Sequence, residues 1–170
     1  NGWTYARDKA VKRWCKSKNI LWHEPAQNGV VRRLNDRDGW AARWYHQMKK
    51  PLIDKPLRLQ AIEEATDVLP SYRELSLAED GTYDLQKGGR SEGLKLLHSF
   101  LYERGEGYTK DMSSPVTAFE SCSRLSAHLA FGTLSVREVF QACETRNQDI
   151  KQMPYGQKGK WPSAMRSFSG

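Results

Sequence analysis

Residues 122–138 read CSRLSAHLAFGTLSVRE and carry the clearest helical signals in the chain. Apolar side chains recur at helical spacing in the first half, so we expect a helix over residues 122–131 that Gly132 closes. The pattern Ser135-x-x-Glu138 is a capping box and predicts the start of the next helix. The inner face of that second helix carries Val136, Val139, Phe140 and Cys143. The stretch therefore predicts two consecutive helices joined by a short turn.

Helical spacing extends over much of the remaining chain. Further helices are predicted over residues 5–18, 34–49, 57–66 and 91–104. Asn19 would stop the first of them, and Asp36 or Asp38 would cap the second. Long loops are predicted over residues 67–90 and 108–121, and the tail, residues 147–170, shows no apolar period. The short apolar run over residues 20–22 is expected to form either one strand or an extended segment between two elements. We therefore expect an all-α protein, an irregular helical bundle with long loops and little or no strand.

Composition excludes several classes of protein. The chain has 170 residues, a net charge of +7 and a mean hydropathy of −0.75, and its apolar runs are only a few residues long. We therefore expect no membrane-spanning segment. The three cysteines are odd in number and widely spaced, which favours a reducing, cytoplasmic setting over a disulfide framework. The four histidines and three cysteines show no metal-ligand spacing, so we expect no metal site.

The charge is unevenly distributed along the chain. Residues 1–60 are strongly basic and rich in tryptophan, residues 61–84 are acidic, and the remainder is again basic. Such a pattern is compatible with an anionic partner such as nucleic acid. It is also the ordinary pattern of a solvated surface, and on charge alone we favour that interpretation.

One group of polar residues could bind phosphate. Residues 121–126, SCSRLS, enter a predicted helix, and hydroxyl groups with unpaired N–H groups at a helix start can bind an anion. Arg124 adds a fixed positive charge, and the Tyr108 hydroxyl could reach the same anion from the preceding loop. The arrangement suits a pyrophosphate. A serine-rich helix start is also a common simple cap, so the motif alone leaves both interpretations open.

The order of the motifs resembles the photolyase/cryptochrome family. In that family a tyrosine and a polar loop precede Thr-Ser-Arg-Leu-Ser, a helix, Phe-Gly and a Ser-x-Arg turn, and residues 108–138 are similar to this pattern. Residues 88–100, GGRSEGLKLLHSF, resemble the Gly-Gly-Glu helix that precedes it there. Residues 5–11 resemble the last helix of the family's antenna domain, and residues 29–51 resemble the crossing into its helical domain.

The resemblance implies an FAD-binding protein. The residues that would contact or shape the FAD phosphate site are Tyr108, Cys122, Ser123, Arg124, Leu125 and Ser126. Cys122 replaces the usual threonine and so removes one hydroxyl contact. Lys110 is a further candidate contact to phosphate, either of FAD or of DNA. None of the family's catalytic residues is expected within this chain.

The resemblance also implies a domain division. Residues 1–28 would be the remnant of the antenna domain and its linker, and residues 29–170 a partial helical FAD-binding domain. We accordingly expect an internal fragment that needs the remainder of the FAD domain to complete its fold and that is inactive alone.

Three hypotheses about function follow. In the first, the parent protein is a DNA photolyase, a carbon–carbon lyase that repairs UV-induced pyrimidine dimers in damaged DNA by electron transfer from reduced FAD. In the second, it is a cryptochrome-type blue-light photoreceptor with no repair activity. In the third, residues 122–146 belong to a helical DNA-binding or scaffold domain without flavin.

Overall fold

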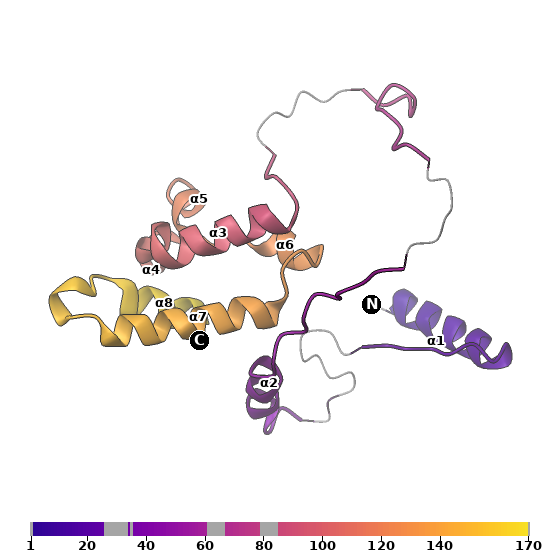
Figure 1. Ribbon diagram of the computed structural model, residues 1–170, viewed down its shortest axis with the longest axis horizontal. Helices are drawn as coiled ribbons and strands as arrows, with labels where there is room; N and C mark the ends of the chain where they lie inside the picture. Colours follow the sequence, from indigo (N-terminus) through magenta and orange to yellow (C-terminus); the bar gives the residue numbers. More distant parts are fainter. Residues whose placement is uncertain (1, 26–33, 35, 61–66, 79–84, 170) are drawn as a thin grey trace. The chain divides into compact units, whose positions relative to one another are not determined.

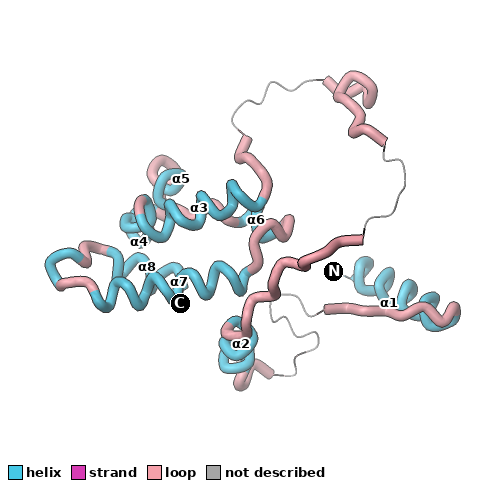
Figure 2. Tube along the Cα trace, viewed as in Figure 1, coloured by secondary structure: helices cyan, strands magenta, loops and turns pink. Residues whose placement is uncertain are grey.

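A computed structural model describes residues 2–25, 34, 36–60, 67–78 and 85–169. All regular secondary structure among these residues is helical, which confirms the all-α prediction (Figures 1 and 2). The α-helices are α1 (Gly2–Ser17), α2 (Trp40–Met48), α3 (Arg90–Tyr102), α4 (Tyr108–Asp111), α5 (Ala118–Ser121), α6 (Ser126–Ala130), α7 (Val136–Gln152) and α8 (Trp161–Ser169). Two 3₁₀ helices, η1 (Arg104–Gly107) and η2 (Tyr155–Gln157), connect some of them.

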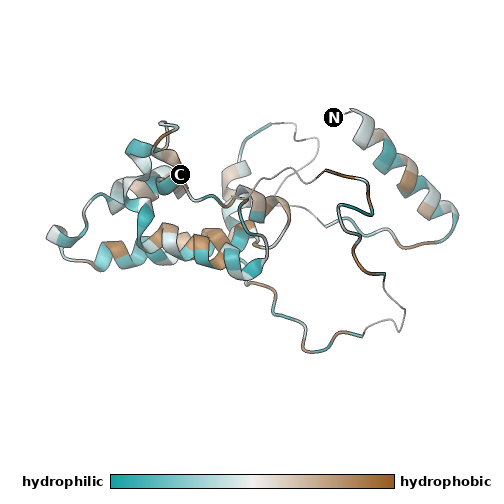
Figure 3. Ribbon diagram, turned by 90° about the horizontal axis from the view of Figure 1, so that it is seen from above, coloured by the Kyte–Doolittle hydropathy of each residue, from teal (hydrophilic) through white to brown (hydrophobic). Residues whose placement is uncertain are grey.

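The chain divides into two compact units, Asn1–Tyr45 and His46–Gly170. The first unit contains α1, which ends where predicted because Asn19 takes a left-handed conformation with φ of 54°. Residues 20–22 follow without forming a strand. Hydrophilic and hydrophobic residues are interspersed along α1 (Figure 3), and of the apolar residues Val11, Trp14 and Cys15, which share one face by helical spacing, only Cys15 is buried. The predicted boundary between residues 28 and 29 lies outside the described residues.

Helix α2 is shorter than the predicted helix over residues 34–49. The Asp36 carboxylate accepts a hydrogen bond from the Asp38 N–H at 2.9 Å, and Gly39 then adopts a φ of 67°. Asp36 therefore stabilises a turn before the helix, and neither aspartate caps it. The predicted helix over residues 57–66 is wrong for residues 57–60, which are not helical, and its remaining residues lie outside the described part of the chain.

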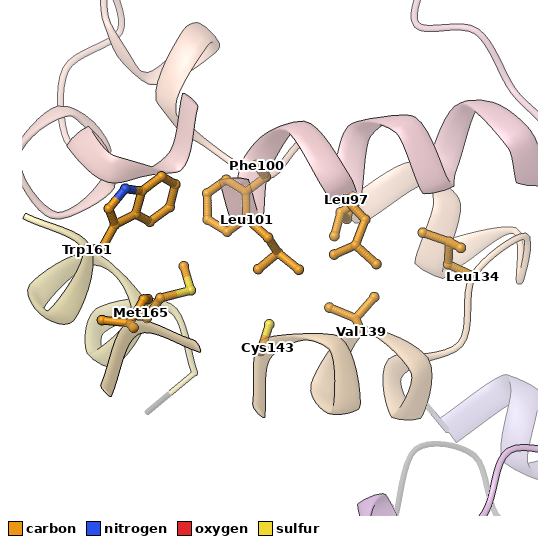
Figure 4. Close-up of a cluster of buried hydrophobic side chains, with 10 residues drawn as sticks. Leu97, Phe100, Leu101, Leu134, Val139, Cys143, Trp161 and Met165 are labelled. Carbon is orange, nitrogen blue, oxygen red and sulfur yellow. The ribbon is translucent and has the colours of Figure 1, made fainter. Parts of the chain in front are cut away.

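The core of the second unit lies between α3, α7 and α8. Phe100 and Leu97 of α3 face Val139 and Cys143, which lie on the inner face predicted for α7 (Figure 4). Burial of these side chains supplies the main driving force for folding, because a large apolar side chain contributes about 1.5–3 kcal/mol when it leaves water. The buried cluster consists of Leu97, Phe100, Leu101, Leu125, Leu134, Val139, Cys143, Ile150, Trp161 and Met165.

The tail contributes to this core, so the prediction of an unpatterned segment over residues 147–170 is wrong. Helix α7 continues to Gln152, and α8 buries Trp161, Ala164 and Met165 at positions i, i+3 and i+4. The sequence pattern missed this helix because prolines and glycines interrupt the tail and usually mark loops. Pro162 occupies the first turn of α8, where the missing N–H has no intrahelical partner to lose.

The predicted loop over residues 108–121 is likewise wrong, since it contains α4 and α5. These helices have four residues each, which is too short to give a recognisable apolar period. Helix α3 ends at Tyr102, before the predicted limit, and η1 follows it directly. By contrast, the described residues of the predicted loop over 67–90 contain no regular element before α3 begins at Arg90.

The capping box at the start of α7 is confirmed. The Ser135 hydroxyl oxygen accepts a hydrogen bond from the Glu138 N–H at 3.1 Å. The Glu138 carboxylate in turn accepts a hydrogen bond from the Arg90 guanidinium at 3.0 Å, which ties the start of α3 to the start of α7. The hydrogen bonds from Arg90 lower the pKa of Glu138, and an N–H from the Ser135 main chain acts in the same direction.

We predict that Glu138→Gln makes stability less dependent on pH. Because the folded pKa of Glu138 is below its unfolded value, the carboxylate stabilises the fold above about pH 4.3 and loses this effect as the pH falls through the folded value. The variant should therefore lower the Tm by a few degrees at neutral pH and by almost nothing at about pH 3. Thermal unfolding at both pH values measures this. Glu92→Gln, which breaks an exposed ion pair with Lys95, is the control and should change Tm little. An equal loss for Glu138→Gln at both pH values would contradict the prediction.

Candidate functional site

The segment between α5 and α6 is not helical, which corrects the predicted start of the helix over residues 122–131. Cys122 is extended, with φ and ψ of −82° and 156°, and Arg124 has a left-handed φ of 59°. Helix α6 therefore begins at Ser126, and the chain turns away after Phe131 where Gly132 has a φ of 70°, as predicted. We call residues 122–126, which comprise this segment and the first residue of α6, the SRLS loop.

The guanidinium of Arg104 lies on the carbonyl side of this loop and donates hydrogen bonds to its carbonyl groups. Its Nη2 donates to the Ser123 carbonyl at 2.9 Å, and its Nη1 donates to the carbonyls of Cys122 and, at 3.2 Å, Glu120. The same side chain also bonds α3, because Nε donates to the Ser99 hydroxyl at 3.0 Å and Nη2 to the Leu96 carbonyl at 3.3 Å. Arg104 thus fixes the SRLS loop to the end of α3.

A row of main-chain N–H groups runs along the loop and the first turn of α6. Within the described part of the chain, the N–H groups of residues 123–128 donate no hydrogen bond. Arg124 has a left-handed φ and Leu125 follows in the αR region, with φ and ψ of −86° and −7°. Alternation of these two conformations brings successive N–H groups together in a concave array that suits anions.

The predicted site residues have different environments. Cys122 and Ser123 are half-buried in the loop, and Ser126 is exposed at the start of α6. Leu125 points into the core and is buried, so its side chain stabilises the loop and is not available to a ligand. The Arg124 guanidinium is half-buried and lies 3.8 Å from the centre of the Phe119 ring.

Tyr108 belongs to the core. Its ring contacts those of Phe100 and Phe168 edge-to-face, with centroids 5.6 Å apart in both pairs. Among the described hydrogen bonds, none joins the Tyr108 hydroxyl to the SRLS loop. Lys110 is exposed on α4. Tyr108 therefore packs against the same cluster that buries Leu125, and the two residues meet the site through the core.

The electrostatics of the loop favour an anion. Burial lowers the pKa of the Arg104 guanidinium, and the positive charge of Arg124 lowers it further. The guanidinium groups of Arg104 and Arg124 therefore lie close enough to repel each other, and the N–H groups of residues 123–128 lie near both. A phosphate or pyrophosphate would accept hydrogen bonds from these N–H groups and lie beside the Arg124 charge, so the residues present fit the phosphate groups of a dinucleotide cofactor.

Sequence reasoning missed Arg104 and Gln86. The Gln86 side-chain amide donates to the Arg124 carbonyl at 2.9 Å, so both residues hold carbonyls of the loop. Neither belongs to a motif, because their partners lie far along the chain and are main-chain atoms. The one local signal for Arg104 is its position just after the end of the strongly apolar helix α3.

Among the described residues, no group brings together the ligands that a metal ion needs, and no helix has the length and hydropathy for a bilayer span. Cys143 is buried, and this burial raises its pKa to about 12, in agreement with its predicted role as a small apolar side chain. Cys122, by contrast, is half-buried.

One curated relative carries the comparison with known proteins. The chain is 31% identical over 111 residues to the deoxyribodipyrimidine photo-lyase of Halobacterium salinarum, and the alignment covers 63% of this chain. The resemblance to the photolyase family is confirmed. The photolyase-like chain spans about a quarter of the length of that relative, since the alignment covers 23% of it. No family model matches the chain, and no solved structure matches it.

Proposed function

We propose that this chain is part of a DNA photolyase that repairs UV-induced pyrimidine dimers by electron transfer from reduced FAD. The similarity to the haloarchaeal photo-lyase carries this proposal. The basic charge of the chain agrees with a DNA substrate, and the absence of a disulfide pattern agrees with the cytoplasm. Residues 1–28 would derive from the antenna domain and residues 29–170 from the FAD-binding domain.

The SRLS loop would bind the phosphate groups of FAD. The N–H groups of residues 123–128 would donate to the phosphate oxygens, and Arg124 would supply a positive charge beside them. Ser123 and Ser126 would add hydroxyl donors. Lys110 would contact a phosphate of FAD or of DNA. Tyr108, whose ring packs in the core, would act by shaping the base of the site. Reduced FAD, when bound, supplies the electron that splits the pyrimidine dimer.

Two measurements on the protein expressed from its complete gene test the function. Heat denaturation should release FAD, and the reduced protein should repair a UV-irradiated oligonucleotide under blue light but not in the dark. Flavin release without light-dependent repair of either dimer type would support a cryptochrome-type receptor and reject the lyase. A protein without flavin would support the helical scaffold hypothesis and reject both.

We predict that Arg124→Ala in the complete protein weakens FAD binding by about tenfold or more. A hydrogen bond or close ion pair to a charged group is worth about 1.5–3 kcal/mol, and this substitution removes the positive charge that the loop itself carries. Retained flavin per mole of folded protein measures the effect. Arg166→Ala, at an exposed position on α8, is the matched control and should retain FAD fully. Equal retention by both variants would refute the role of Arg124.

A further inference from the structure

Arg104 contacts more main-chain acceptors than any predicted site residue, although no motif includes it. Its donors reach the carbonyls of Leu96, Glu120, Cys122 and Ser123 and the Ser99 hydroxyl. We propose that Arg104 is the positioning residue of the phosphate site and that it acts by turning the N–H groups of the SRLS loop outward. This inference rests on the proposed function, because the ligand is the phosphate of FAD.

The direction of the N–H groups follows from peptide geometry. In a trans peptide, the carbonyl of one residue and the N–H of the next point in opposite directions. The described peptides are all trans. Because the carbonyls of Cys122 and Ser123 point at Arg104, the N–H groups of Ser123 and Arg124 point away from it. Arg104 thus determines which side of the loop carries donors.

Gln86 and α6 extend this array of donors. The Arg124 carbonyl accepts from Gln86, so the N–H of Leu125 points away from Gln86. The N–H groups of residues 126–128 belong to the first turn of α6 and have no partner among the described residues. The array therefore begins with the two peptides that Arg104 holds and continues into the helix.

Lysine could not replace Arg104 in this role. A guanidinium presents five N–H donors in one rigid plane, whereas an ammonium presents three donors from a single atom. Arg104 uses Nε, Nη1 and Nη2 on separate acceptors, and its Cζ lies 5.7 Å from the centre of the Phe100 ring. An ammonium at the same place would keep the charge but release some of the carbonyls, and the loop could then rotate its peptides.

The test compares Arg104→Lys with the wild type in the protein expressed from its complete gene. FAD and riboflavin are titrated into flavin-free protein, because riboflavin has the ring system without phosphate. We expect the Kd for FAD to rise about 10- to 100-fold and the Kd for riboflavin to change less than about threefold. Arg146→Lys is the matched control, since the buried Arg146 likewise donates to a main-chain carbonyl, that of Leu101 at 2.8 Å, but belongs to α7. It should lower Tm and leave both Kd values unchanged.

The possible failures are distinguishable. A wild-type protein that binds neither flavin overturns the proposed function. A wild-type protein that binds FAD while Arg104→Lys binds it equally, or loses FAD and riboflavin to the same extent, overturns the positioning role. If Arg104→Lys does not fold, amide hydrogen exchange of the wild type decides: the N–H groups of residues 123–128 should exchange rapidly without flavin and be protected at least tenfold by FAD. Unchanged exchange on FAD binding would overturn the inference.

Discussion

Gly105→Ala should destabilise the second unit by about 3 kcal/mol, the upper end of the usual cost of overpacking, because no neighbouring group can move aside. A Cβ atom at Gly105 would lie 2.2 Å from the Phe100 carbonyl oxygen and 3.0 Å from two atoms of the Phe100 ring. The oxygen belongs to the main chain of α3 and the ring is fully buried, so neither can give way cheaply. The main chain of η1 can lie this close to the last turn of α3 only because residue 105 has no side chain.

Urea denaturation followed by circular dichroism measures the loss. Gly156→Ala is the matched control, because a Cβ there meets nothing within 4 Å and the backbone φ is not positive. It should change the free energy of unfolding by less than about 0.5 kcal/mol. Equal stability of the two variants would show that η1 does not approach α3 as closely as described.

Phe100→Ala should destabilise the protein by about 3–5 kcal/mol, the usual cost of truncating a buried phenylalanine. Phe100 has no exposed surface and lies at the centre of the cluster. Its ring contacts those of Phe168 and Tyr108, with centroids 4.5 and 5.6 Å away, so the cavity would open between three elements. Loss of the Phe168 contact would also weaken the packing of α8 against α3.

Phe131→Ala is the matched control for Phe100→Ala, because it removes the same side chain from an exposed position. Phe131 follows α6 and is 85% exposed, so its truncation should change the free energy of unfolding by less than about 0.5 kcal/mol. Both variants are compared by the urea midpoint and by amide hydrogen exchange in α3. A loss below 1 kcal/mol for Phe100→Ala would contradict the central place of its ring in the core.

Long helices with an uninterrupted apolar period could be predicted from the sequence. Helix α3 and helix α7 occur close to their predicted positions, and the Ser135 cap has the predicted partner. The tail could not be predicted, because α8 is amphipathic only over nine residues and carries a proline in its first turn. The start of α6 was missed since the left-handed Arg124 depends on Arg104 and Gln86, which are remote in sequence.

The same difference applies to the candidate site. The sequence alone determined the all-α class, the inner faces of α3 and α7, and the motif order that resembles photolyases, because each depends on the spacing of neighbouring residues. Only the tertiary structure decided that Leu125 and Tyr108 pack in the core and that Arg104 holds the loop. A carbonyl that bonds a guanidinium 19 positions earlier leaves no sequence pattern, since every residue has a carbonyl and only the fold brings these groups together.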